Sequence, residues 1–299
     1  MKPDVSIVIR TKNEEKDLPH LLKSIRLQKN NKPYEIILVD SGSTDKTLEI
    51  AQKNDIAIFH IPRQDFTYGY ALNIGVKHAK GDIIIFVSAH VSIMDKNWLE
   101  NLISPLKDNS IQCTYGKLIG NKNQNPFENI IWRNMFPDKN MLFTKSTNLE
   151  KLSISNSNAA YKKAFLLNNK FNEKIPYAED FLMGMEIIKK GYKIMYVSDA
   201  SIIHSHPFNF KNNIVLNFKA GFSNLLINAL NKEKKKNIFR LFLNNIKDFF
   251  LEFVYLLKKL ISNGNYKTII KLFFYEISRL NGKLTGELKF YCLNYSSLK

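Results

Sequence analysis

Apolar and polar residues alternate in blocks along the first part of the chain. Short runs of consecutive apolar residues, each followed by a polar turn, predict β-strands, and the segments between them carry apolar residues at helical spacing. The predicted elements are a strand at Val5–Arg10, a helix at Leu18–Leu27, a strand at Glu35–Asp40, a helix ending near Lys53, a strand at Ile56–Phe59, a helix at Tyr70–Ala79 and a strand at Ile83–Val87. This alternation predicts an α/β fold with a doubly wound, mostly parallel sheet.

The strand at Ile83–Val87 is apolar without interruption, which predicts that both of its faces are covered. Polar Ser88 and His90 follow it directly. In open α/β sheets, ligands bind beyond the carboxyl ends of the strands. Ser88 and His90 are therefore candidate ligand-binding residues, although a core strand followed by an ordinary loop has the same pattern.

The rest of the chain has weaker periodicity, and residues 153–161 are small and polar with no assigned element. The predicted elements are a helix at Lys96–Leu106, a strand at Ile111–Tyr115, a short helix near Phe127–Met135 within a long polar loop at 120–150, a helix at Phe181–Lys190, strand-like segments at Tyr192–Val197 and Ser201–Ile203, and helices from Asn209 onward. We expect two domains, an α/β domain at residues 1–208 and a basic, aromatic-rich helical region at 209–299.

Charge narrows the choice of partners. The chain has 44 Lys and Arg against 27 Asp and Glu, a net charge of +17. Such a chain is attracted to nucleic acid, a membrane surface or a phosphorylated substrate. Residues 232–299 are the most basic segment, with 14 basic and 5 acidic side chains.

Cysteine content and hydropathy indicate the compartment. Cys113 and Cys292 are far apart, so neither a disulfide framework nor a CxxC site is predicted, and a reducing cytoplasm is the expected setting. The first residues do not read as a signal peptide. No apolar run of about 18 residues is present, so no transmembrane helix is predicted.

Two common phosphate-binding motifs are absent. No GxGxxG follows the first strand, which disfavours a nicotinamide or flavin site, and no GxxxxGK[ST] indicates a P-loop. Polar residues do follow the first two strands: Asp40 ends the second strand, and Thr11 and Glu14 follow the first. A carboxylate at this edge can accept from a nucleobase N–H or a ribose hydroxyl. The turn after Asp40 offers N–H groups beside a helix N-terminus, which suits an anion, whereas Asp45 is more simply a helix cap.

Several segments together resemble the family 2 glycosyltransferases of the GT-A fold. Their combined order is more specific than any one of them, and the resemblance covers about residues 4–206. The segments are Ser6–Glu14 (SIVIRTKNE), Val39–Asp45 (VDSGSTD), the spaced residues Gly69, Ala71, Asn73 and Gly75, Ala79–Asp82 (AKGD), Glu179-Asp180, Gly191-Tyr192 and His204. The resemblance implies a glycosyltransferase with a GT-A (Rossmann-like), mostly parallel sheet flanked by helices, followed by a C-terminal helical region.

The resemblance also implies roles for individual residues. The donor would be a nucleotide-diphosphate sugar and the transfer inverting, with Asp180 as catalytic base. Thr11 and Asp40 would hold the nucleoside, with Glu14 nearby. Other residues implied at the donor are Asn13, Ser43, Asn73, Ser88, His90 and Glu179. A carboxylate within hydrogen-bond reach of the acceptor hydroxyl suffices as base, although an Asp at a helix start is also an ordinary cap.

One motif of the family is missing. The DXD motif, which would hold a divalent metal against the diphosphate, is replaced by Ser88-Ala89-His90. The leaving group still needs its developing charge neutralised. Three alternatives stay open. His90 and His204 bind a metal, which favours Mn²⁺ over Mg²⁺; or His90 donates directly to phosphate; or the chain is an inactive nucleotide-sugar- or glycan-binding protein of the same fold.

Within the family, the chain resembles bacterial rhamnosyltransferases more than chitin or cellulose synthases, whose QxxRW motif it lacks. The residues that carry this likeness are Trp98-Leu99, Tyr115-Gly116-Lys117, Phe136-Pro137, residues 155–160 and His204-Ser205-His206. The likeness implies a dTDP- or UDP-linked donor, a glycan or lipid-linked acceptor, and a place in surface-polysaccharide synthesis.

The basic tail has two interpretations. Phe and Leu at helical spacing usually form a core, and Lys side chains are usually solvated. A helix with Phe, Leu, Tyr and Lys also suits the surface of an anionic bilayer. The second interpretation predicts a cytoplasmic protein that binds peripherally to the inner face of the membrane through residues 235–299. A basic patch alone is poor evidence for nucleic-acid binding, and no nucleic-acid partner is expected.

Overall fold

The computed structural model describes residues 2–29, 32–121, 126–147, 151–204, 206, 209–211, 213–215, 217–218, 221, 238–262 and 269–292. The chain divides into two compact units. Residues 1–121, 131–173 and 179–205 form the first unit, and residues 122–130, 174–178 and 206–299 form the second. The domain limits expected from the sequence, 1–208 and 209–299, stay a prediction. Parts of the tail that the sequence predicts to be helical, residues 222–237, 263–268 and 293–299, lie outside the described residues.

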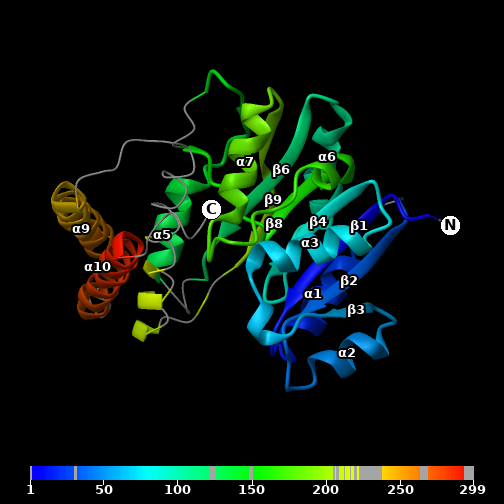
Figure 1. The fold of residues 1–299 in the computed structure, drawn as a ribbon, viewed down its shortest axis with the longest axis horizontal. Coiled ribbons are helices and arrows are strands. Elements are labelled where there is room, and N and C mark those ends of the chain that lie inside the picture. Colours follow the sequence, from blue (N-terminus) through cyan, green and yellow to red (C-terminus); the bar gives the residue numbers. More distant parts are fainter. Residues whose placement is uncertain are drawn as a thin grey trace. The chain divides into compact units, whose positions relative to one another are not determined.

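A nine-stranded mixed sheet is the centre of the first unit, and its strands run from blue to green in Figure 1. The order is β3-β2-β1-β4-β8-β6-β9-β5, and β7 pairs with β9. Strands β1 to β4 are parallel, whereas β8 is antiparallel to both β4 and β6. The strands are β1 (Val5–Thr11), β2 (Tyr34–Asp40), β3 (Ala57–His60), β4 (Ile83–Ser88), β5 (Ser92–Ile93), β6 (Ile111–Ile119), β7 (Met141–Phe143), β8 (Asn158–Lys162) and β9 (Lys193–Ile203).

Helices pack against this sheet as the α/β prediction requires. Helix α3 contacts β1 and β2, α4 contacts β9, and α7 contacts β6 and β9. The helices of the described residues are α1 (Leu18–Arg26), α2 (Thr47–Lys53), α3 (Tyr68–His78), α4 (Trp98–Ile103), α5 (Pro126–Met135), α6 (Lys163–Asn168), α7 (Glu179–Lys189), α9 (Ile238–Ser262) and α10 (Ile269–Cys292), with short 3₁₀ turns at Arg63–Asp65 and Ser104–Lys107. The α/β class is confirmed, with a C-terminal helical region.

The apolar strand β4 is central and fully covered. Ile84, Ile85, Phe86 and Val87 are all 0% exposed, as an unbroken apolar run predicts. The chain crosses from β3 to β4 on the opposite side of β1, so the strand order reverses at β1. Such a switch point is where α/β sheets open a crevice for ligands. The carboxyl ends of β1, β2 and β4 therefore frame the candidate site.

Strand β8 is the main element that the sequence pattern missed. Its polar first residue, Asn158, is fully buried, and both the oxygen and the nitrogen of its side-chain amide form hydrogen bonds. The Trp98 indole N–H donates to Asn158 Oδ1 at 2.9 Å, and Asn158 Nδ2 donates to the Ala200 carbonyl at 2.7 Å. Ala159 and Ala160 fill the narrow space between β4 and β6. A strand of small and polar residues is stable here because these partners satisfy its polar group.

Two other boundaries also differ from the sequence prediction. Helix α7 begins at Glu179 rather than Phe181, so Glu179 and Asp180 belong to its first turn. The two strand-like segments near the end of the first unit form one continuous strand, β9, paired in parallel with β6. The pairing explains the continuity, since β9 pairs with β6 on both sides of the polar interruption, through Val197 before it and through Ile202 and Ile203 after it, with a register shift between them.

Two glycines of the family-like segments are required by packing. A Cβ at Gly75 would lie 2.4 Å from the Val8 side chain, so its absence lets α3 lie directly on β1. A Cβ at Gly69 would lie 2.2 Å from the Asn172 carbonyl oxygen. Both distances are far shorter than van der Waals contact, so any side chain at either position would push α3 away from its neighbours.

Helices α9 and α10 pair antiparallel in the second unit. Arg279 Nη2 lies 3.0 Å from Glu252 Oε2, and Lys283 Nζ lies 3.7 Å from Asp248 Oδ2, so rising numbers on one helix face falling numbers on the other. Buried Glu276 accepts from Arg279 Nε at 2.8 Å. Burial raises the pKa of Glu276 to about 7. Among the described helices, none is both long enough and apolar enough to cross a bilayer.

Candidate functional site

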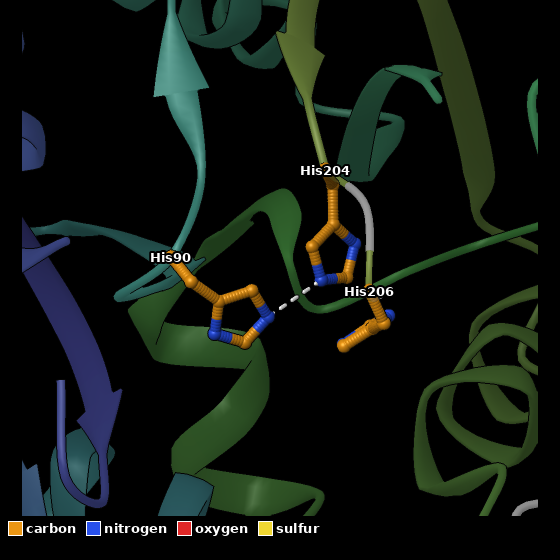
Figure 2. A group of neighbouring side chains, drawn as sticks. All are labelled: His90, His204 and His206. Carbon is orange, nitrogen blue, oxygen red and sulfur yellow. Dashed lines mark hydrogen bonds between the residues drawn. The ribbon is translucent and has the colours of Figure 1, made fainter. Parts of the chain in front are cut away.

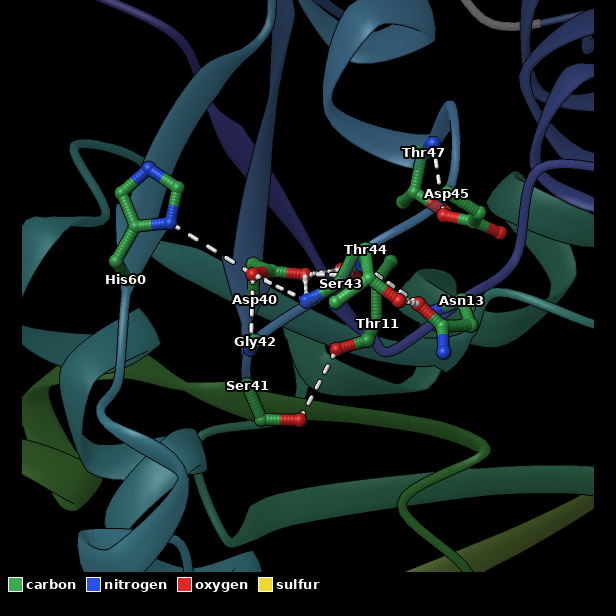
Figure 3. Close-up of polar contacts among 10 residues, drawn as sticks. All are labelled: Thr11, Asn13, Asp40, Ser41, Gly42, Ser43, Thr44, Asp45, Thr47 and His60. Carbon is green, nitrogen blue, oxygen red and sulfur yellow. Dashed lines mark hydrogen bonds and ion pairs between the residues drawn. The ribbon is translucent and has the colours of Figure 1, made fainter.

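The turn after β2 encloses the carboxylate of Asp40, which is 1% exposed (Figure 3). Asp40 Oδ2 accepts from the backbone N–H of Gly42 at 2.9 Å and of Ser43 at 3.1 Å. Its Oδ1 accepts from the hydroxyls of Ser43 and, at 3.4 Å, Thr11. His60 Nδ1 lies 3.7 Å from Oδ2. Strand register explains the contact with Thr11, which lies opposite Asp40 on β1. The carboxylate fixes the loop at the edge of the crevice.

Asn13 ties the loop after β1 to the loop after β2 (Figure 3). Its backbone N–H donates to Ser43 Oγ at 2.9 Å, and its side-chain Oδ1 accepts from the Thr44 N–H at 2.8 Å. Asn13 has a φ of 56°, a left-handed conformation that Asn adopts more readily than most residues. Asn13, Thr11, Ser43 and Asp40 therefore form one connected network, as their shared place at the sheet edge predicts.

Asp45 accepts from the first N–H of α2 from the position just before the N-cap residue Lys46, close to the simpler of its two interpretations. Its Oδ1 accepts from the Thr47 N–H at 3.0 Å, and its Oδ2 accepts from the Glu15 N–H at 3.0 Å. Partial burial works against ionisation, but the hydrogen bonds from Thr47 and Glu15 outweigh it and lower the pKa of Asp45. The carboxylate thus stabilises the start of α2.

His90 and His204 meet beyond the ends of β4 and β9 (Figure 2). Their Nε2 atoms are 2.9 Å apart, and the rings stack at 4.9 Å between centroids. His90 Nδ1 lies 2.8 Å from Glu14 Oε1. A neutral His90 that donates from Nδ1 to this carboxylate presents the lone pair of Nε2 toward His204. The His204 ring also stacks on Trp132, with 5.6 Å between ring centroids.

This arrangement fits a metal ion in its donor set. In many metal sites a carboxylate orients the imidazole that binds the ion, as Glu14 orients His90. Two nitrogens that bind one ion at about 2.1 Å stand about 3 Å apart, close to the spacing of the two Nε2 atoms. His206 follows two residues after His204 and belongs to the second unit. The donor set is imidazole-rich, which suits Mn²⁺ better than Mg²⁺.

Asp180 is the carboxylate with the most perturbed protonation in the crevice. Burial raises its pKa to about 7, and the negative charge of neighbouring Glu179 adds to this effect. Two backbone donors oppose it: the Phe181 N–H at 2.8 Å and the Asn156 N–H at 3.4 Å. The charge of Arg10 opposes it as well. A carboxylate with a pKa near 7 is suited to take a proton at physiological pH.

Two of the predicted donor-binding residues make other contacts. Asn73 on α3 donates to the Phe171 carbonyl at 3.0 Å and accepts from the Phe171 N–H at 3.0 Å, so the structure does not bring it into the network around Asp40. Ser88 Oγ donates to Ser157 Oγ at 2.9 Å at the end of β4. A role for either residue at the donor stays a prediction, as do the roles of Thr11, Asn13, Glu14, Asp40, Ser43, His90, Glu179, Asp180 and His204.

Arg10, Asn156 and Trp132 are site residues that the sequence did not single out. Arg10 lies at the carboxyl end of β1, opposite Ser88 on β4, and its Nη1 is 3.9 Å from Glu179 Oε1. Its place at the end of an apolar strand was a usable signal. Asn156 lies in the segment 155–160 that carries the rhamnosyltransferase likeness, but nothing in that segment marks it as a site residue, and no local pattern marks Trp132. A separate hollow of about 600 Å³, lined by Lys2, Tyr34 and Lys163 among others, lies at the opposite, amino end of the strands.

Comparison with known proteins identifies the fold and family of this site. The family model for glycosyl transferase family 2 matches residues 6–168. The chain is 32% identical over 212 residues to the O-antigen chain rhamnosyltransferase RfbN of Salmonella typhimurium, covering 68% of this chain and 67% of that protein. It is 31% identical over 188 residues to WbaN of Salmonella anatum, covering 60% of this chain and 59% of the relative.

Solved structures share the fold at low sequence identity. S. aureus TarS 1–349 in complex with UDP superposes with a TM-score of 0.58 at 19% identity, covering 97% of this chain and 91% of TarS. The mannosyltransferase PcManGT from Pyrobaculum calidifontis, in complex with GDP-Man and Mn²⁺, gives 0.63 at 16% identity, covering 97% and 88%. These likenesses concern the fold alone. With the family model matching more than half of its length, the chain belongs to glycosyltransferase family 2 and is a glycosyltransferase.

Proposed function

We propose that this glycosyltransferase inverts the anomeric centre of a nucleotide-diphosphate sugar and transfers the sugar to a glycan or lipid-linked acceptor, with Asp180 as the base. The observation that carries the proposal is the Asp180 carboxylate, whose pKa burial and Glu179 raise to about 7 at the start of α7. An inverting transfer needs one such group and no covalent intermediate.

The proposed step balances as a single displacement. The acceptor oxygen attacks the anomeric carbon while its proton moves to an oxygen of Asp180. The bond between that carbon and the diphosphate oxygen breaks, and its electron pair leaves with the nucleoside diphosphate. Because Asp180 must be ionised to accept the proton, the rate rises with pH through about 7.

The Asp40 network supports a nucleotide donor. Its carboxylate is held by loop donors at the carboxyl ends of β1 and β2, where ligands of α/β sheets bind. TarS and PcManGT of the same fold are complexed with UDP and GDP-Man. The relatives RfbN and WbaN are rhamnosyltransferases of the O-antigen chain. We therefore place this protein in bacterial surface-polysaccharide synthesis with a dTDP- or UDP-linked deoxysugar or hexose as donor.

A divalent ion at His90 and His204 would complete the site. When bound, such an ion neutralises the charge that develops on the diphosphate. Glu14 holds the His90 ring so that Nε2 faces His204. Manganese is bound in PcManGT. Mn²⁺ titration followed by electron paramagnetic resonance tests the assignment without a turnover assay. We expect weaker Mn²⁺ binding in both His90→Ala and His204→Ala. Unchanged Mn²⁺ binding in both variants would rule out this metal site and support the alternative in which His90 donates directly to phosphate.

The transfer reaction is tested with a panel of dTDP- and UDP-sugars, with Mn²⁺ or Mg²⁺ present. The enzyme releases nucleoside diphosphate from at least one donor, and Asp180→Asn releases far less while binding the same nucleotide in a thermal-shift assay. A wild-type protein that binds nucleotide sugar and never turns it over supports the alternative, an inactive nucleotide-sugar- or glycan-binding protein.

The exposed face of the α9–α10 pair supports attachment to an anionic membrane. Phe250, Val254 and Ile261 recur at positions that fall within a narrow arc of α9, and they are 59%, 45% and 46% exposed. Lys247 and Lys258 are exposed next to this arc. Such large apolar side chains next to lysines match the interfacial region of a bilayer, where apolar groups enter and ammonium groups meet lipid phosphates.

Helix α10 also carries exposed apolar side chains. Phe273 and Phe274 are about half exposed, and the antiparallel pairing places them level with Lys258 of α9. Exposed Lys271 lies one turn or less away along α10. We propose that this face binds a membrane surface that contains acidic lipids and so brings a lipid-linked acceptor to the enzyme.

Vesicle flotation of the full chain tests the attachment. We expect binding to phosphatidylcholine vesicles that contain phosphatidylglycerol, weaker binding without it, and loss of binding in a Phe250→Ser/Val254→Ser variant. Met94→Ser, which removes a 72% exposed apolar side chain from the first unit, is the matched control. Equal flotation of the double variant and the wild type would contradict the proposal.

A further inference from the structure

Arg10 is a buried cation at the carboxyl end of β1. Its side chain is only 15% exposed, which is unusual for a charged residue. The apolar residues Val8 and Ile9 before it are fully buried, and Arg10 is the polar residue that follows them at the carboxyl end of the strand. Burying a guanidinium is costly unless an opposite charge or hydrogen-bond acceptors compensate it.

The compensation that Arg10 finds is partial. Its guanidinium carbon lies 5.2 Å from the ring centroid of Tyr68, a cation–π contact at the start of α3. Its Nη1 lies 3.9 Å from Glu179 Oε1, at the outer limit of an ion pair. Within the described part of the chain, buried Nε and Nη1 have no hydrogen-bond acceptor. Buried donors without an acceptor are rare in proteins, so the two nitrogens of Arg10 call for an explanation.

The neighbours of Arg10 supply that explanation. Glu179 is 5% exposed, so its carboxylate needs a cation nearby. Asp180 is the next residue along α7, and the Arg10 charge favours its ionised form. The other titratable groups whose charges couple to Asp180 are Cys113 on β6 and Tyr161 on β8, both neutral when protonated in their buried sites. Among the described residues, Arg10 is therefore a cation that lies close to Glu179 and whose charge also acts on Asp180.

We propose that Arg10 is a positioning residue for the Glu179–Asp180 pair, held against the face of Tyr68 with N–H groups reserved for the Glu179 carboxylate. The proposal rests on the assignment of Asp180 as base. Arg10 touches neither donor nor acceptor in this role. It keeps two adjacent carboxylates stable side by side, and so allows Asp180 to ionise near neutral pH.

The test is the pH dependence of kcat in variants of the full chain. Removing a cation next to a carboxylate raises the pKa of that carboxylate, and the base must be ionised to act. Arg10→Gln therefore shifts the rising limb of the kcat profile to higher pH by about one unit, a roughly tenfold loss below the limb and little loss above it. Arg10→Lys keeps the charge and shifts the limb less. Tyr68→Leu gives a shift in the same direction, because the guanidinium is less well held.

Arg26→Gln is the matched control, since Arg26 is an exposed arginine of α1 that donates to Asn54 Oδ1 at 2.7 Å. A uniform fall in kcat for Arg10→Gln, with the limb unmoved, would overturn the proposal and leave the base assignment intact. A wild type without turnover, or with a profile that Asp180→Asn does not alter, would instead overturn the proposed function. Nucleotide binding by thermal shift shows that each variant is folded.

Discussion

Asp40 and Asp180 are two buried or half-buried aspartates of the same unit with opposite surroundings. Asp40 ends β2 and accepts from two backbone N–H groups and two hydroxyls. Asp180 lies in the first turn of α7, accepts from two backbone N–H groups, and follows a second carboxylate, Glu179. The donors around Asp40 hold its carboxylate in place. Burial and the neighbouring Glu179 instead destabilise the ionised form of Asp180.

The difference separates binding from chemistry. A carboxylate that is saturated with donors is a fixed acceptor, which suits the positioning of a ligand. A carboxylate that burial and a neighbouring charge destabilise gains a pKa of about 7, which suits proton transfer. The same residue type therefore serves two functions in the crevice, and replacement by Asn tests each function separately.

The largest expected effect is on turnover in Asp180→Asn. An amide cannot accept the acceptor proton, so kcat falls by about 10²–10⁴. Nucleotide affinity changes little, because the Asp40 network is intact. The measurement is the rate of nucleoside diphosphate release under saturating donor, with affinity from calorimetry. A parallel loss of affinity and rate would show that Asp180 serves binding rather than proton transfer.

The next effect concerns the metal. Glu14→Gln removes the charge that orients His90 while keeping a side chain of the same size. Loss of a carboxylate that hydrogen-bonds to a metal-binding imidazole typically weakens metal affinity about 10–100-fold. Mn²⁺ titration of Glu14→Gln and of Glu15→Gln compares this carboxylate with its neighbour in sequence, whose Oε2 accepts from the Lys46 N–H instead. Equal affinities in the two variants would mean that the Glu14–His90 contact does not support a metal.

The smallest expected effects are on stability, and they have opposite signs. The pKa of Asp180 is raised in the folded state, from 3.8 to about 7, so its contribution to stability is complete below about pH 3.8 and is lost as the pH rises through 7. Asp180→Asn therefore raises the Tm at pH 8, by about 2–4 °C for each kcal/mol relieved. Asp40→Asn lowers it, because an amide group facing N–H donors costs about 1–3 kcal/mol.

Calorimetric scans at pH 5 and pH 8 measure this pair of effects. Asp65→Asn, at an exposed aspartate, controls for the change in net charge. The gain for Asp180→Asn is larger at pH 8 than at pH 5. Two variants that shift the Tm in the same direction at pH 8 would remove the contrast between the two sites.

The sequence predicted the parts of the fold that depend on local pattern. The buried strand β4, the alternation that builds β1 to β4, and the polar loop ends at Thr11, Asp40 and Ser88 all follow from uninterrupted apolar runs and the residues after them. Strand β8 did not follow, because Asn158 is satisfied by Trp98 and Ala200, which are distant in sequence. Burial of a polar residue depends on partners that a local window does not contain.

In the candidate site, too, local pattern predicts single residues, whereas their contacts depend on residues that are distant in sequence. A metal held by His90 and His204 is one of three alternatives that the sequence leaves open, but only the fold brings Glu14 to His90 and Trp132 to His204. Arg10 was visible in the sequence as the end of a strand. Its relation to Glu179 depends on where α7 begins, and that boundary was misplaced by two residues.

The pH dependence of the transfer rate tests the central claim most directly. With a donor that the wild type turns over and Mn²⁺ present, kcat rises about tenfold per pH unit below pH 7 and levels off above it, as a single base with that pKa requires. Asp180→Asn has a low rate without this limb. A wild-type rate that is constant from pH 5.5 to 8.5, or an Asp180→Asn variant that keeps the wild-type limb, would contradict the account.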